Sequence, residues 1–285
     1  MTDARNGAFS DFLKRDSLVV AFALAVITVL AWVYLAVLNG EMQTAAMSAQ
    51  MPAMPGMHGM GDMSGMVNGR GGTMAPALFA WTPTHFLFIF AMWAVMMVGM
   101  MTPSVSPMVL IYSRLARTAS AQGAAFASSA WFAGGYLIAW TSFALAASLA
   151  QYALDRAALL SPMMALQSRT FGGAVLIAAG MYQWLPVKSV CLANCRAPLA
   201  FVQRHGGFSA SALGSLRLGA LHGLYCVGCC WALMLLLFVA GVMNLFWIAA
   251  LMLIVLAEKL LPFGMHLSRG VGVIAIAWGL WLLAT

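Results

Sequence analysis

Long apolar runs alternate with shorter polar connections along the chain, and this pattern predicts helices rather than strands. Seven runs approach the roughly 20 apolar residues that a helix needs to cross a bilayer. They are Leu18–Leu38, His85–Tyr112, Ala124–Ala150, Thr170–Leu185, Leu216–Val239, Leu245–Leu261 and Val271–Ala284. The first run is longer than the apolar core of a signal peptide, which favours a membrane anchor. The sequence therefore predicts an all-α fold, a polytopic bundle of about seven transmembrane helices.

Polar stretches and prolines divide this pattern into parts. Residues 1–38 form an N-terminal tail and first anchor, residues 39–83 a Met/Gly/Pro-rich loop, and residues 84–285 a six-helix membrane core. The second apolar run is interrupted by TPSVSP, where Pro103 and Pro107 predict a break and a buried kink.

Composition supports a chain surrounded by lipid. Hydrophobic residues make up 63% of the 285 and charged residues only 7%, against about 25% charged in soluble domains. The net charge of +7 comes from scattered residues without a Lys/Arg run, which argues against a nucleic-acid partner and for a role in membrane orientation.

The distribution of Lys and Arg predicts the orientation. With the N-terminus inside and the C-terminus outside, the inner side holds Arg5, Lys14, Arg15, Arg114, Arg117, Lys188, Arg196, Arg204, Arg217, Lys259 and Arg269, and the outer side Arg70, Arg156 and Arg169. Positive charge gathers on the cytoplasmic side of membrane proteins. We therefore expect a multi-pass membrane protein with the Met-rich loop outside, in a periplasm or its equivalent.

That loop contains MPAMPGMHGMGDMSGM, with a methionine at every third position. The tract comprises Met51, Met54, Met57, His58, Met60, Met63 and Met66. Its prolines and glycines exclude a stable helix, and it lacks the branched and aromatic residues of a core. Thioethers are soft ligands that select Cu(I), and imidazole also suits Cu(II). The tract predicts copper capture; the alternative is a linker with biased composition.

The second apolar run carries a further set of methionines. On a helix, His85, Met92, Met96 and Met100 share one stripe, and Met97 and Met101 lie on the adjacent flank. Because methionine also fills gaps in apolar cores, these thioethers are either copper ligands or packing.

The fifth run reads GALHGLYCVGCCWALM and gathers one imidazole and three thiols. His222, Cys226 and Cys229 share a helical face, and Cys230 lies one turn from Cys226. Polar groups inside a membrane-spanning helix are energetically costly and usually functional. The set predicts a soft-metal site, although a single buried cysteine would indicate only packing.

Cys191 and Cys195 follow Pro186 on the predicted inner side, where thiols stay reduced. A pair spaced by four can offer two thiolates to one metal or act in redox chemistry. The alternative is two thiols with neither role. Other polar residues are less specific. We expect Glu258 and Lys259 to form an interfacial pair, with a proton site at Glu258 as the alternative, and His205 and His266 to be solvated. Asn244 is a turn residue, with a ligand role as the alternative.

Three segments together resemble a known family. MWAVMMVGMMTPSVSPM, MYQWLPVKSVCLANCRAP and HGLYCVGCCWALMLLLFVAGVMNLFWIAALMLIVLAEKLLP are similar to the bacterial predicted metal-binding integral membrane proteins, which include a membrane copper chaperone associated with tyrosinase. The resemblance covers residues 84–262 and implies copper handling. The positions of this sequence that match the family's motifs are Met96, Met97, Met100, Met101, Pro103, Pro107, Cys191, Cys195, His222, Cys226, Cys229, Cys230, Asn244 and Glu258.

These observations predict a copper chaperone or Cu(I) relay that delivers its ion to a copper enzyme or another membrane or periplasmic partner. The sequence contains no catalytic motif, so we expect no enzymatic activity. Two alternatives remain at this stage: a membrane thiol–disulfide oxidoreductase, and a non-catalytic assembly partner whose Met and Cys residues only pack. Silver and zinc remain alternative ions.

Overall fold

A computed structural model describes residues 2–50, 81–121, 129–161, 164–207 and 211–285, with side chains omitted for residues 2–17, 45–50 and 115–121. The described part of the chain forms nine α-helices. They are α1 (Thr2–Gln50), α2 (Pro83–Ala121), α3 (Ser129–Arg156), α4 (Arg169–Tyr182), α5 (Pro186–Arg196), α6 (Pro198–Arg204), α7 (Ala212–Ala240), α8 (Leu245–Leu260) and α9 (Gly264–Ala284). The all-α prediction is confirmed.

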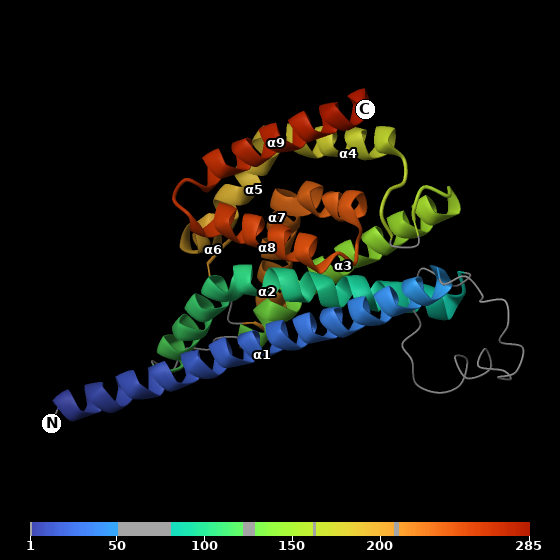
Figure 1. Cartoon of the computed structure of the whole chain (residues 1–285). Coiled ribbons are helices and arrows are strands. Elements are labelled where there is room, and N and C mark those ends of the chain that lie inside the picture. Colours follow the sequence, from blue (N-terminus) through green and yellow to red (C-terminus); the bar gives the residue numbers. More distant parts are fainter. Residues whose placement is uncertain (1, 51–80, 122–128, 162–163, 208–210) are drawn as a thin grey trace, which may run out of the picture.

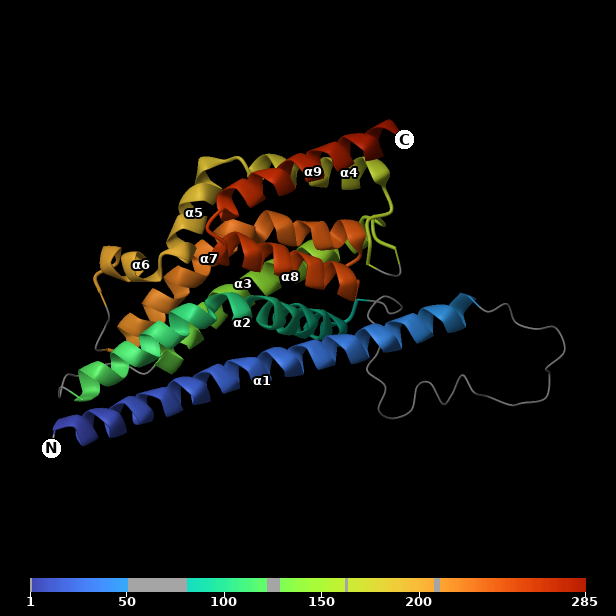
Figure 2. The same cartoon turned by 60° about the vertical axis from the view of Figure 1, so that its left-hand side comes forward.

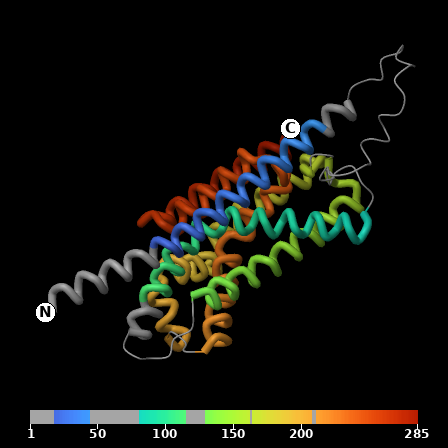
Figure 3. The backbone as a smooth tube through the Cα atoms, turned by 90° about the horizontal axis from the view of Figure 1, so that it is seen from below, coloured from blue at the N-terminus to red at the C-terminus, as the bar shows by residue number. Residues whose placement is uncertain are grey.

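The helices are stacked in layers around α7. Helix α1 lies on one flank against α2, the pair α4 and α9 lies on the opposite flank, and α7 and α8 lie between them (Figures 1 and 2). Seen from below, α1 extends along the length of the bundle (Figure 3). Helix α7 packs against α3, α4, α5 and α8, which makes it the centre of the fold.

Five described helices are long and apolar enough to cross a membrane. These segments are Leu18–Thr44, Pro83–Arg114, Ser129–Arg156, Ala212–Ala240 and Gly264–Ala284. A sixth span results if α4 and α5 count as one, because they pass the same criterion together although they meet at a bend of 63°. The predicted run Leu245–Leu261 forms α8, which has only 16 residues. The structure therefore supports five or six spans, and seven remains a prediction.

The predicted break in the second span is wrong. Helix α2 continues through Pro103 and Pro107 to Ala121, and it changes direction along its length (Figures 1 and 2). Hydroxyl groups supply hydrogen bonds around the prolines: Thr102 donates to the carbonyl of Val98 at 2.6 Å. Such side-chain bonds allow a membrane helix to tolerate proline.

Two helix pairs pack with their backbones nearly in contact. A Cβ atom at Gly219 of α7 would lie 1.9 Å from the carbonyl oxygen of Phe132 in α3. A Cβ atom at Gly279 of α9 would lie 2.7 Å from the carbonyl oxygen of Gly173 in α4. Because small residues let membrane helices approach closely, these glycines fix the spacing within the pairs α3/α7 and α4/α9.

Candidate metal centre

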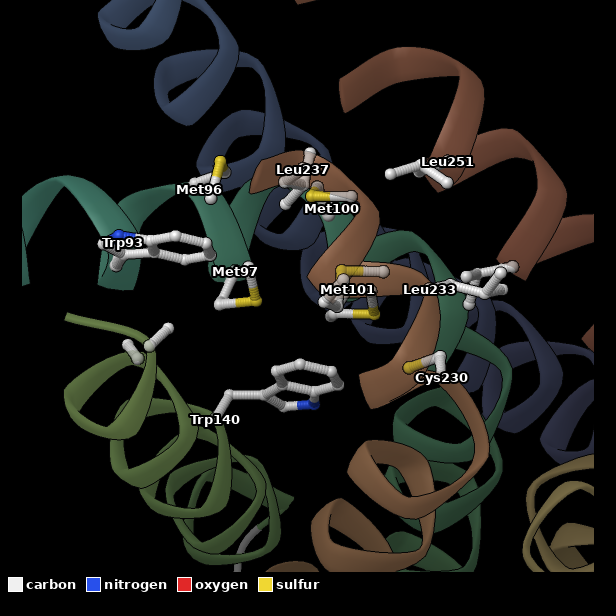
Figure 4. Close-up of a cluster of buried hydrophobic side chains, with 14 of the residues drawn as sticks. Trp93, Met96, Met97, Met100, Met101, Trp140, Cys230, Leu233, Leu237 and Leu251 are labelled. Carbon is white, nitrogen blue, oxygen red and sulfur yellow. The ribbon is translucent and has the colours of Figure 1, made fainter. Parts of the chain in front are cut away.

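The methionines of α2 line the interior of the bundle. The predicted ligands are buried, with Met92, Met96, Met97, Met100 and Met101 no more than 2% exposed. Figure 4 shows Met97 and Met101 facing the same buried region as the ring of Trp140 in α3 and the thiol of Cys230 in α7. The helical spacing thus places thioethers from α2 beside a thiol from α7.

His85, which the sequence placed on the same stripe, has a different environment. It is half-buried at the start of α2, and its ring lies 4.9 Å from the ring of Trp81 between centroids. The stripe of buried thioethers therefore begins deeper in the bundle than His85.

The two cysteine groups that the sequence treated separately lie together. Pro186 begins α5, which turns back from α4 and packs against α7. The thiol of Cys195 in α5 lies close to the thiols of Cys226 and Cys229 in α7. The cysteine pair of α5 and the cysteines of α7 thus form one group, called here the thiol cluster, which comprises Cys191, Cys195, Cys226, Cys229 and Cys230.

A glycine allows Cys191 to reach α7. A Cβ atom at Gly228 would lie 2.8 Å from the Cys191 Sγ atom. The Cys191 thiol therefore packs against bare backbone, where any larger residue would displace it. All five cysteines are free thiols, and Cys226, Cys229 and Cys230 are buried.

Cys226 lies at the centre of this cluster. Its Sγ atom is 2.8 Å from the Lys259 ammonium of α8 and 3.1 Å from the Tyr136 hydroxyl of α3. Lys259 also donates to the Ser104 hydroxyl of α2 at 3.1 Å. Side chains of α3 and α8 thus meet at this sulfur of α7, and Lys259 connects the contact to α2.

The second buried lysine pairs with the acidic residue next to Lys259. The Lys188 ammonium of α5 lies 3.0 and 2.9 Å from the two carboxylate oxygens of Glu258 in α8. Lys188 also donates to Gln183, and both charged side chains are at most 1% exposed. The predicted interfacial Glu258–Lys259 pair is therefore wrong, because each residue has a different buried partner.

His222 lies one helical turn from Cys226 in an aromatic environment. Its ring is 5.0 Å from Phe201, 5.8 Å from Phe132 and 6.1 Å from Tyr136, measured between centroids. The side chain is 4% exposed, and its Nδ1 atom has no hydrogen-bond partner. A buried imidazole nitrogen without a partner is an available metal ligand.

The neighbouring thiols do not form a ready metal-binding group in the described part of the chain. Among the described residues, no three His, Cys, Asp or Glu side chains are grouped so that they could hold a metal ion together. The soft donors of this region are therefore few thiols at any one point, together with the buried thioethers of α2. Cu(I) tolerates such soft, low-coordinate surroundings better than zinc, which normally takes four ligands.

Comparison with known proteins identifies the family. A family model described as "PpoB2: Copper chaperone" matches residues 90–282, more than half of the chain. The chain belongs to the PpoB2 copper chaperone family. No curated protein and no solved structure matches it.

The segment that matches the PpoB2 family contains all five cysteines, His222 and the methionines of α2 from Met92 onward. Helix α1 and the predicted capture tract, Met51–Met66 with His58, precede it. That tract lies outside the described residues, so its role remains a prediction.

Sequence reasoning missed two partners of Cys226 in this PpoB2 family member, Tyr136 and Lys259. Lys259 gives no signal of this contact in the sequence, because a lysine at the end of an apolar run ordinarily extends to the membrane interface. Tyr136 lies on another helix, so its contact with Cys226 is also not signalled by the sequence. Asn244 has a structural role: it caps α8 by accepting from the Trp247 N–H at 3.2 Å.

Proposed function

We propose that this PpoB2 family member is a Cu(I) relay within the membrane. The Met51–Met66 tract captures the ion, the methionines of α2 carry it inward, and the thiol cluster holds it before delivery to a copper enzyme. The role is non-catalytic, since the ion changes ligands and not oxidation state.

The observation that carries this proposal is the convergence of soft donors from three helices. Methionines of α2 and the Cys230 thiol of α7 face the same interior region (Figure 4), and Cys195 of α5 reaches Cys226 and Cys229. Thioether and thiolate ligands select Cu(I) over hard cations. Adjacent sites with few ligands each allow an ion to be passed on by exchange, without release to water.

The orientation of the proposed relay follows the charge pattern. Seven spans with the N-terminus inside, in a bacterial inner membrane, would place the capture tract outside. A single cysteine introduced by Ser64→Cys, in a chain whose five native cysteines are serine, should react with an impermeant thiol reagent added to intact cells. Absence of labelling in intact cells, with labelling after lysis, would reverse this orientation.

Copper analysis of the purified protein tests the relay. Under anaerobic reducing conditions, we expect at least one Cu(I) per chain and a large loss in a Cys226→Ser/Cys229→Ser variant. Met181→Leu is the matched control, because this methionine is 55% exposed on α4 and outside the proposed route. Copper loading that is equal in all three proteins, or absent from the wild type, contradicts the relay.

The proximity of Cys195 to Cys226 and Cys229 also favours a second candidate, a thiol–disulfide oxidoreductase. In that case alkylation of the air-exposed protein would trap a disulfide between α5 and α7, and the reduced protein would bind no Cu(I). Bound Cu(I) together with free thiols in cells eliminates this candidate.

A further inference from the structure

A cavity of about 460 Å³ opens at the N-terminal end of α7. Its lining combines two basic side chains, His205 and Arg217, with glycines and two leucines of α7. One of these, Leu218, is one helical turn before His222 on the same face. The cavity therefore lies beside the histidine end of the proposed copper route.

Two imidazoles flank a single buried phenyl ring at this place. The ring of Phe201 in α6 lies 4.5 Å from that of His205 and 5.0 Å from that of His222, between centroids. Phe201 is 1% exposed, whereas His205 is half-buried and faces the cavity. His205 is thus not simply solvated, as the sequence suggested; it stands between the cavity and the interior.

The hydrogen bonds of both histidines leave metal-binding nitrogens available. His205 Nδ1 lies 2.7 Å from the carbonyl oxygen of Phe201. When Nδ1–H donates to this carbonyl, the lone pair remains on Nε2, the arrangement that orients metal-binding histidines in other proteins. Behind Phe201, the Nδ1 atom of His222 is buried and has no partner.

We propose that this cavity is a copper transfer port, in which His205 passes Cu(I) between His222 and an acceptor with anionic, thiolate ligands. The port rests on the proposed function and adds the place and chemistry of the hand-over. In the transfer, a Cu–N bond to His205 breaks as a Cu–S bond to the acceptor forms. Copper remains Cu(I), and no electron is exchanged.

The walls of the cavity fit an anionic acceptor. The exposed Arg217 side chain carries a positive charge at the cavity and attracts an anionic acceptor. Gly206 and Gly207 have φ angles of 92° and 82°, a conformation that favours glycine, and a Cβ atom at either would meet open space. This side of the cavity therefore offers an acceptor close access to His205.

Copper release to an impermeant anionic chelator, bathocuproine disulfonate, tests the port. Membrane vesicles of both orientations would be loaded with Cu(I) and mixed with the chelator, and formation of the Cu(I)–chelator complex would be followed over time. The signal from vesicles that lack the protein would be subtracted. We expect His205→Ala to slow release about tenfold, the lower range for loss of a group near a metal site, and only in the orientation that exposes α6. Arg217→Gln should slow the same phase, and the control His266→Ala, an exposed histidine of α9, should not.

The outcomes separate the port from the relay. Wild-type vesicles that take up no Cu(I) contradict the proposed function itself. Vesicles that load copper but release it equally fast with His205→Ala and His266→Ala overturn the port alone, as does slowing in both orientations. A Phe201→Leu variant gives a second measurement, because a smaller side chain between the imidazoles should speed release while His205 is present.

Discussion

The buried Lys188–Glu258 pair is the most informative point to perturb, because it anchors α5 and therefore the position of Cys191 and Cys195. Substituting Lys188→Met keeps most of the apolar stem and removes the charge. Glu258, which is 1% exposed, would then be buried without its main partner. Removing one member of a buried ion pair typically costs about 3–5 kcal/mol.

That cost corresponds to a decrease of about 10²–10⁴ in the folding equilibrium constant, since each 1.4 kcal/mol is a factor of ten. Unfolding in mixed micelles with increasing SDS, followed by the fluorescence of the 10 tryptophans, would measure it. Arg204→Met, at an exposed position of α6, is the control and should change the free energy of unfolding by less than about 0.5 kcal/mol.

The double variant Lys188→Met/Glu258→Leu isolates the interaction. Replacing both members of a buried ion pair with apolar residues is often nearly neutral, so the double variant should be more stable than either single one. A cost below about 1 kcal/mol for Lys188→Met, or a double variant whose loss equals the sum of the single losses, would refute the reasoning. We also expect weaker Cu(I) binding in the single variant, because α5 loses its anchor.

Other features allow further tests. Met97→Leu/Met101→Leu conserves volume and should cost less than about 1.5 kcal/mol per site in stability, yet it should slow Cu(I) loading in a stopped-flow assay; an unchanged rate would make these methionines packing residues. Gly219→Ala would place a Cβ atom 1.9 Å from a carbonyl oxygen of α3 and should prevent stable folding in detergent. Gly134→Ala meets only a side-chain atom at 3.7 Å and should be neutral or stabilising by up to about 1 kcal/mol, as thermal unfolding would show. Deleting residues 51–66 should reduce loading only at limiting copper, and unchanged loading would make the tract a linker.

Features that depend on the spacing of residues within one helix could be predicted from the sequence. The burial of Met92, Met96 and Met100 follows from their spacing on one helix, as does the approach of His222 to Cys226 within one turn. Both sets lie in helices that apolar length alone identifies. The fold class and the donors within one helix could therefore be read before the structure was known.

Contacts between distant segments could not be read in this way. The partnership of Lys188 with Glu258 joins residues 70 positions apart, and the nearer Lys259 was the obvious partner. Cys195 reaches Cys226 only because the chain bends by 63° between α4 and α5. Pro186 indicated a new helix there, but its direction is set by packing against α7.

The bend between α4 and α5 has a mechanical consequence for the thiol cluster. Cys191 and Cys195 stand on α5, which meets α4 of the glycine-packed pair α4/α9 at a bend of 63°, whereas Cys226 and Cys229 belong to α7 of the pair α3/α7. Glycine contacts fix the spacing of the helices within each pair, so the distance between the two groups of thiols depends on how α5 packs against α7. In the proposed relay, the number of thiols that can bind one ion is therefore set at the contact between the two pairs of helices, rather than within either pair.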